Sequence, residues 1–271
     1  MPYDAASIMI IHRYKTFVKL VKRTATMKAM ILAAGEGTRL RPLTLQRPKP
    51  MLPVGGKPLL EYTIELLKRH GITQIAINLH HKPKAITDYF GDGQDFGVEI
   101  TYSLEEPILG TAGAVKALQD YFDDTFIVCY GDVLTDLDLS TLIAFHTMAQ
   151  GGVTIALYHV ENPSACGLVG LDKKWRITRF VEKPPPEQVF TDLANSGILV
   201  LEPGTINHIP PGTFYDFGHD LLPELLGKEI PMYGYPIPHS TYLIDIGTME
   251  KYKRAQREWP EVLAGSWIAE G

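Results

Sequence analysis

Short apolar runs alternate with segments of helical periodicity along the first half of the chain. The apolar runs are typical of buried strands, and we predict strands at residues 30–34, 74–79, 98–102 and 125–130. Helices are predicted between them, one from residue 59 to near His70-Gly71 and two at residues 83–90 and 112–122. Alternating strands and helices build right-handed βαβ units, so we expect helices over a mostly parallel sheet and a ligand crevice at the carboxyl ends of its strands.

The pattern becomes richer in strands after Gly151. Strands are predicted at residues 153–160, 168–171, 177–181, 196–201 and 242–248, and helices at 217–226 and 249–259. The later strands fit a mixed sheet. The expected fold class is therefore α/β, a Rossmann-like three-layer sandwich with a mixed, mostly parallel sheet.

The first 26 residues differ from the rest of the chain. They carry five Lys and Arg and one acid, a charge of +4, which leaves −9 for the remainder of a chain with a net charge of −5. A basic amphipathic helix over residues 8–21 would suit a targeting segment, but no small-residue cleavage site or long apolar core follows it. We expect an extension at residues 1–26, poorly ordered or not native, one domain at 27–260 and a tail at 261–271.

Composition limits the class of protein. A chain of 271 residues that is 45% hydrophobic can bury a large core, and its acidic balance argues against a nucleic-acid or anionic-membrane binder. Cys129 and Cys166 stand in apolar surroundings, which suits reduced thiols in a cytoplasmic protein. No stretch approaches the roughly 18 apolar residues of a membrane span. Small anions are the favoured partners.

One stretch, residues 28–58, combines a strand, a glycine loop and proline-fixed cations. The apolar run stops at Gly35, and Gly35 and Gly37 allow positive φ and a close approach of backbone N–H groups to a polyphosphate. Arg39 adds a planar cationic fork, and four prolines hold Lys49 on a stiff segment. The stretch reads as a phosphate site.

The spacing of these residues excludes two common glycine motifs. The dinucleotide fingerprint needs a third glycine where Leu40 stands, and the P-loop needs Gly-Lys-Ser/Thr. The strings GEGTRLRPLT and PKPMLPVGGKP instead resemble the signature of the sugar-1-phosphate nucleotidylyltransferases, and the resemblance covers about residues 27–255. It implies a glycosyltransferase-A-like nucleotidyltransferase fold and an enzyme that makes an NDP-sugar and pyrophosphate from a nucleoside triphosphate and a sugar 1-phosphate.

The resemblance also implies a role for each matching residue. The nucleotide would be bound by Ala33, Gly35, Gly37, Thr38, Arg39, Gly110 and Thr111. Arg39, Lys49 and Asp132 would be catalytic, and Asp132 and Asp245 would bind Mg²⁺. The sugar phosphate would be bound by Gly167, Glu182, Lys183 and Asn195.

Each role has a plainer alternative. Asp132 follows an apolar strand, where a carboxylate is costly unless it is paired or metal-bound, but it could also cap a turn. Glu182 and Lys183 could form an ordinary solvated pair, and Asn195 could be a turn residue.

The substrates are less defined than the reaction. The strings RLRPLT, PKPMLPV and LGTAGA look most like the mannose-1-phosphate guanylyltransferases, which implies GTP and mannose 1-phosphate. Ala33-Ala34 departs from the glycine-containing turn of some relatives, so glucose-1-phosphate thymidylyl- or uridylyltransferase and sugar-acid uridylyltransferase stay open. So does a non-catalytic regulatory homologue that binds nucleotide sugars. We expect no nucleic-acid or membrane partner, and the oligomeric state, a homodimer included, is left open.

Overall fold

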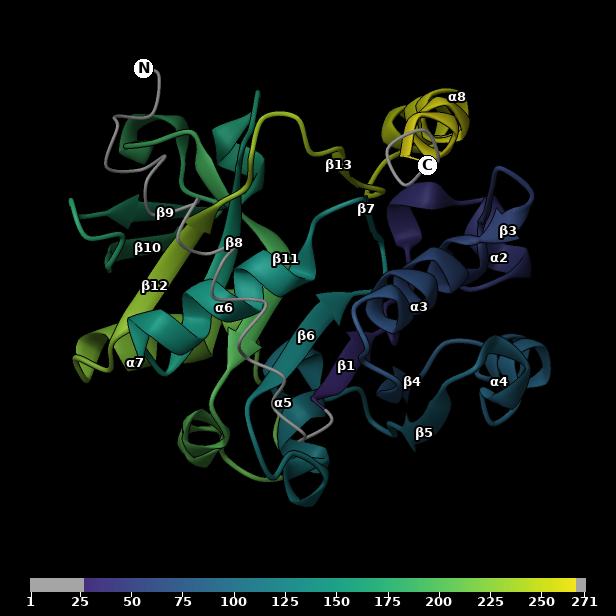
Figure 1. Cartoon of the computed structure of the whole chain (residues 1–271), viewed down its shortest axis with the longest axis horizontal. Coiled ribbons are helices and arrows are strands. Elements are labelled where there is room, and N and C mark those ends of the chain that lie inside the picture. The colour runs from purple at the N-terminus through teal and green to yellow at the C-terminus, as the bar shows by residue number, and fades with distance from the viewer. Residues whose placement is uncertain (1–26, 267–271) are drawn as a thin grey trace.

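The computed structural model describes residues 27–266, which form a mixed nine-stranded sheet covered by helices (Figure 1). The strands of this sheet are β1 (Lys28–Leu32), β4 (Gln74–Leu79), β5 (Glu99–Leu104), β6 (Phe126–Tyr130), β8 (Val153–His159), β9 (Gly167–Leu171), β10 (Ile177–Glu182), β11 (Leu193–Leu201) and β12 (Met232–Pro236). The main path runs β10-β9-β11-β6-β1-β4-β5, with β8 beside β11 and β12 beside β8. The predicted extension and the end of the predicted tail lie outside the described residues.

Strand β1 lies at the centre of the parallel half of the sheet. It pairs in parallel with β4 and β6, and β4 pairs in parallel with β5. The loops that follow these four strands therefore share one edge. On the other side of β6, strand β11 is antiparallel to β6, β8 and β9, so the predicted mixed sheet is confirmed.

Helices cover both faces of the sheet. Side chains alternate along β1: Ile31 packs with the helices α3 (Leu59–Arg69), α4 (Lys84–Phe90) and α6 (Leu139–Ala149). Met30 packs on the opposite face with α5 (Gly110–Ala117) and α7 (Leu222–Gly227). Because successive residues of a strand point to opposite faces, one apolar strand supplies both cores. The predicted three-layer sandwich is confirmed.

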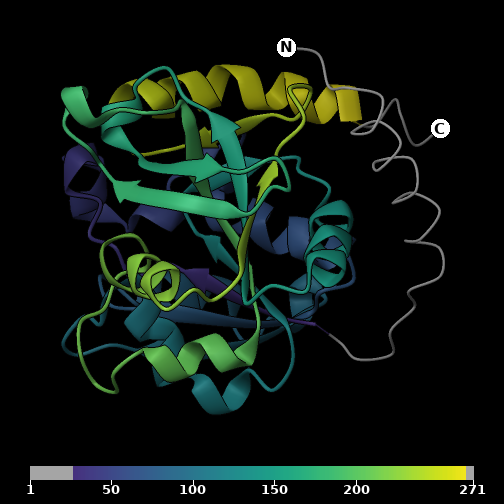
Figure 2. The ribbon, with the colours of Figure 1, turned by 90° about the vertical axis from the view of Figure 1, so that its left-hand side faces the viewer.

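A third core lies beside the main sheet. Its framework is a two-stranded antiparallel ribbon of β7 (Val133–Thr135) and β13 (Leu243–Asp245), the hairpin of β2 (Pro53–Val54) and β3 (Lys57–Pro58), and helix α8 (Met249–Ser266). Tyr62 of α3 and Trp259 of α8 meet there edge to face, with ring centroids 5.4 Å apart. Figure 2 shows α8 along the top of the molecule. No helix in residues 27–266 has both the length and the apolar character of a membrane span.

Helix α6 and strand β12 are among the elements that the sequence pattern does not predict. Helix α6 has apolar residues around most of its circumference, so its periodicity is weak, although the side chain of Asp138 caps it by accepting hydrogen bonds from Ser140 N and Thr141 N. Strand β12 is short and contains Gly234 and Pro236, which are uncommon in strands. It forms because β8 offers it a parallel partner.

Several predicted boundaries also shift. Helix α5 begins at Gly110 and ends at Ala117, and the segment predicted as a helix at 217–226 begins with a π-helical turn at Phe217–Leu221. The strand predicted at 242–248 is limited to β13. Helix α8 continues past the predicted domain boundary at residue 260, because Val262 and Leu263 pack against the third core.

Candidate active site

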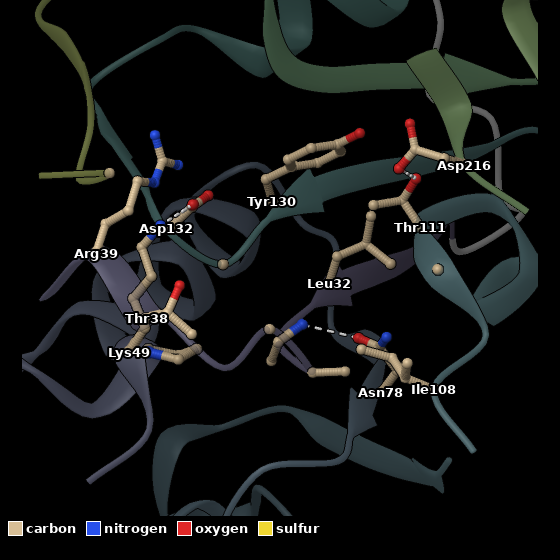
Figure 3. A pocket seen from close by; sticks show the side chains of 18 of the residues that line it. Leu32, Thr38, Arg39, Lys49, Asn78, Ile108, Thr111, Tyr130, Asp132 and Asp216 are labelled. Carbon is tan, nitrogen blue, oxygen red and sulfur yellow. Dashed lines mark hydrogen bonds and ion pairs between the residues drawn. The ribbon is translucent and has the colours of Figure 1, made fainter. Parts of the chain in front are cut away.

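A cavity of about 360 Å³ opens at the carboxyl edge of the parallel strands. Its walls come from the loop after β1, the segment up to Pro50, the end of β6 and the start of α5 (Figure 3). Nine predicted site residues line it: Ala33, Gly35, Gly37, Thr38, Arg39, Lys49, Gly110, Thr111 and Asp132. The topology thus brings together the residues assigned to the nucleotide and to catalysis.

The glycine loop is held tightly against the segment that carries Lys49. Gly37 has φ +63°, and a Cβ there would lie 3.0 Å from Lys49 Cβ, so no larger residue fits without strain. The Thr44 hydroxyl donates to Gly37 O at 2.9 Å, which fixes the turn. The expectation of a positive φ is wrong for Gly35, which serves instead as an open position where a Cβ would meet nothing within 4 Å.

Opposite charges gather at one side of the cavity. Lys49 Nζ forms an ion pair with Asp132 Oδ2, and their side chains are 12% and 26% exposed. Figure 3 shows Arg39 beside this pair. A Cβ on Gly247 would lie 3.3 Å from Arg39 Nη2 and 3.2 Å from Asp245 Oδ2, so the guanidinium and that carboxylate both lie against the open Cβ position of this glycine.

The ribbon of β7 and β13 brings the two aspartates together, although 112 positions separate them in the sequence. The N–H of Ile246 donates to Asp132 O at 2.9 Å, and Asp245 stands opposite Val133. Asp245 borders the cavity rather than lining it.

The two carboxylates are donors of the kind that Mg²⁺ binds. Within residues 27–266, no three His, Cys, Asp and Glu residues gather as a metal-binding group. Mg²⁺ nevertheless commonly binds through one or two carboxylates and completes its shell with water and substrate phosphates. Each carboxylate is paired with a lysine side chain. Lys49 pairs with Asp132, and Lys251 Nζ lies 3.3 Å from Asp245 Oδ2. The chemistry of these donors therefore suits a hard divalent cation.

A buried polar pair that the sequence interpretation missed lies beneath the loop that follows β1. Asn78 Oδ1 accepts from Ala33 N at 2.7 Å, and Asn78 Nδ2 donates to Glu105 Oε1 at 2.8 Å. The other carboxylate oxygen of Glu105 accepts from Leu109 N at 2.9 Å, and Glu105 is only 2% exposed. The pair therefore fixes the loop after β1 against the loop that enters α5. The only sign of this pair in the sequence is Asn78 itself, a polar residue near the end of the apolar run of β4.

Replacing Glu105 by Ala is expected to destabilise the fold by about 2 kcal/mol or more, because the Asn78 amide and the Leu109 N–H would be left unsatisfied. The loop before α5 would also loosen, so the KM for the nucleotide should rise. Denaturant unfolding and steady-state kinetics measure the two effects. Glu106→Ala is the matched control, since Glu106 is the next residue in the chain and its side chain is exposed. Equal stabilities of the two variants would contradict the assigned role.

The side of the cavity opposite Arg39 and Lys49 is also polar. It contains Thr111, which was predicted, and Asp216, which was not. The Thr111 hydroxyl donates to Asp216 Oδ2 at 2.8 Å (Figure 3). Asp216 Oδ1 accepts from Gly218 N at 2.8 Å. Because Asp216 begins a helical turn, its sequence position indicates only a cap. Tyr130 lies between the two sides, and burial raises the pKa of its phenol, which therefore stays neutral.

The four residues assigned to the sugar phosphate lie beyond the cavity lining but next to it. Glu182 is opposite Gly167 in the β9–β10 pair, and a Cβ at Gly167 would collide with Glu182 Oε2. Lys183 Nζ lies 3.1 Å from Glu182 Oε1. Asn195 Oδ1 accepts from Gly197 N at 2.9 Å, and a Cβ at Gly197 would contact the Tyr130 ring. Tyr130 thus connects this group to the cavity.

The cysteines differ from each other. Cys129 is buried in β6, as expected, but Cys166 is only partly buried and its carbonyl accepts from Lys183 N at 3.1 Å. The expectation of fully apolar surroundings is therefore wrong for Cys166, because it adjoins the polar group around Glu182.

Comparison with known proteins defines the class. A family model described as nucleotidyl transferase matches residues 28–261, and the chain therefore belongs to this family. The family-level identification made from the sequence strings is confirmed.

The relatives of this chain have names that give different nucleotides and different sugars. The chain is 43% identical over 245 residues to a UTP–glucose-1-phosphate uridylyltransferase of Synechocystis sp., which covers 85% of this chain and 63% of the relative. It is 36% identical over 248 residues to the mannose-1-phosphate guanylyltransferase of Mycobacterium tuberculosis, covering 90% of this chain and 67% of the relative. The chain thus spans about two thirds of the length of these relatives.

A solved structure supports the fold assignment. HddC from Yersinia pseudotuberculosis, complexed with GMP-PN, matches with a TM-score of 0.73 and 28% identity, covering 86% of this chain and 99% of that one. The nucleotidyltransferase fold expected from the sequence is confirmed.

Proposed function

We propose that this chain transfers a nucleoside monophosphate from a nucleoside triphosphate to a sugar 1-phosphate and releases pyrophosphate. The observation that carries the proposal is the gathering of Arg39 and Lys49 with Asp132 and Asp245 behind a tight glycine loop. Cations that converge on one side of a cavity suit polyphosphate binding, and the carboxylates suit a divalent cation.

In the proposed reaction, an oxygen of the sugar phosphate attacks the α-phosphorus while the bond to the departing pyrophosphate breaks. The attacking oxygen is already anionic, so no protein nucleophile or general base is needed. Arg39 and Lys49 hold and neutralise the triphosphate, and Lys183 holds the sugar phosphate in line with it. When bound between Asp132 and Asp245, Mg²⁺ would supply neutralisation of the charge on the phosphate oxygens.

A non-catalytic regulatory homologue is the alternative of another class. Such a homologue would be expected to have lost the phosphate arginine, the lysine or an aspartate. All four residues are present here, and Lys49 and Asp132 are paired at the cavity. Their retention favours the enzyme.

Two substrate pairs are supported. The strings quoted above and the guanylyltransferase relative favour GTP and mannose 1-phosphate. The higher identity to the uridylyltransferase favours UTP and glucose 1-phosphate. We propose GTP and mannose 1-phosphate as the first candidate and UTP and glucose 1-phosphate as the second.

A pyrophosphate-release screen tests the activity and the substrates together. GTP, UTP, dTTP and ATP are each combined with mannose 1-phosphate, glucose 1-phosphate and a sugar-acid 1-phosphate. One pair is expected to exceed the others in kcat/KM. Tight binding of an NDP-sugar without pyrophosphate release from any pair would support the regulatory alternative and contradict the enzyme.

Replacing Lys183 by Ala is expected to raise the KM for the sugar 1-phosphate by about tenfold or more, since a charged hydrogen bond to phosphate would be lost. The KM for the nucleotide should change little. Lys173→Ala serves as the control because Lys173 is exposed on the turn between β9 and β10. An equal rise in both KM values would contradict the assignment.

A further inference from the structure

We propose that Lys251 is a further ligand of the sugar 1-phosphate, and that it holds the Asp245 carboxylate while that phosphate is absent. This inference rests on the proposed function and adds a residue of α8 to the acceptor side of the site.

The position of Lys251 is set by the start of α8. The Lys251 N–H donates to Thr248 Oγ1 at 3.3 Å, and the hydroxyl of the next residue, Tyr252, donates to Pro53 O at 2.7 Å. Tyr252 is buried in the third core, so the first turns of the helix cannot rotate freely. Lys251 Nζ reaches back to Asp245 Oδ2 at 3.3 Å, and its side chain remains 41% exposed. An amine that is fixed at its base and half exposed at its tip can accept a new partner.

The surroundings of Lys251 are those of the acceptor site. Burial raises the pKa of the Cys166 thiol, while a hydrogen bond with Tyr158 and the nearby positive charge of Lys251 act in the opposite direction. Cys166 is also bonded through its carbonyl to Lys183 N. The backbone N–H of Lys183, at the end of β10, and the charge of Lys251, from α8, therefore both act on Cys166. A phosphate dianion bound beside Cys166 would be attracted by the amines of both lysines.

The charges of the site favour an exchange of partners. Each aspartate is paired with one lysine, Lys49 with Asp132 and Lys251 with Asp245. A divalent cation shared by the two carboxylates would compete with both lysines. The released amines then suit the two anionic substrates, Lys49 on the triphosphate side and Lys251 on the sugar-phosphate side. Lys251 therefore opposes metal binding and favours acceptor binding.

This opposition makes the inference testable with Lys251→Gln. The dissociation constant for Mn²⁺, measured by electron paramagnetic resonance without substrates, is expected to fall about two- to fivefold, since a half-exposed ion pair with Asp245 would be removed. The KM for the sugar 1-phosphate that the enzyme uses best should rise about tenfold or more, with the nucleotide KM within about twofold. Lys251→Arg should restore the sugar 1-phosphate KM to within about threefold.

The control variant is Lys253→Gln, which removes the same charge from an exposed position of the same helix. This variant is expected to leave the Mn²⁺ dissociation constant and the sugar 1-phosphate KM unchanged. An unchanged sugar 1-phosphate KM in Lys251→Gln, or weaker Mn²⁺ binding, would overturn the inference. Failure of the wild-type chain to release pyrophosphate with any substrate pair would instead contradict the proposed function, so the two failures are distinguishable.

Discussion

Asp132→Asn is expected to lower turnover by about a hundredfold or more while the fold remains intact. Asn keeps the size of the side chain, and the backbone bond from Ile246 N to Asp132 O does not depend on the carboxylate. What is lost is the negative charge that pairs with Lys49 and that would hold a divalent cation with Asp245. Turnover measured across a magnesium titration, together with the melting temperature, tests this result.

The same titration applied to Asp245→Asn and to the double variant tests whether the two carboxylates act as one unit. Residues that share one task are not additive, so the double variant should be little worse than the worse single variant. Asp120→Asn is the charge-matched control, since Asp120 is exposed near the far end of α5. Near-wild-type turnover in either single variant, or full activity in excess chelator, would end the shared-metal proposal.

Lys49→Met is expected to reduce kcat/KM by about a hundredfold, the second large effect. The side chain is only 12% exposed and points at Asp132, so its charge acts in a site partly shielded from water. Met keeps much of the volume and removes the charge. Steady-state kinetics with the preferred substrate pair measure the loss.

Arg41→Gln is the control for Lys49. Arg41 lies on the same proline-rich segment, but its side chain is 54% exposed and faces Glu36 at 3.6 Å. An exposed pair of this kind contributes little, so near-wild-type kinetics are expected. Similar losses in both variants would mean that the segment acts only through its net positive charge.

The parallel half of the fold could be predicted because its strands are apolar on both faces. Strand β1 supplies Ile31 to one core and Met30 to the other, which leaves a continuous apolar run in the sequence. Helix α6 and strand β12 gave no such signal. The periodicity of α6 is weak, and β12 depends on pairing with β8, a contact between distant residues that local patterns do not contain.

The candidate site likewise contains residues that a local sequence pattern indicates and residues that it does not. Gly37, Arg39 and Lys49 belong to one local string, and a short stretch of sequence can indicate them together. Asn78, Glu105 and Asp216 come from three separate segments, and each reads locally as an ordinary strand-end or capping residue. Only the register of the sheet brings their side chains to the cavity, so spacing alone could not identify them.

The third core joins early and late segments of the chain. Leu40 and Val54 pack there with Ile246 and Trp259, and the ribbon that orients Asp132 needs β13 as its second strand. During synthesis, the glycine loop and the first aspartate emerge long before the strand that carries the second aspartate. We therefore expect a nascent chain without β13 and α8 to form the parallel sheet but not the ribbon that orients both aspartates, so that the proposed turnover begins only once α8 has emerged from the ribosome and packed.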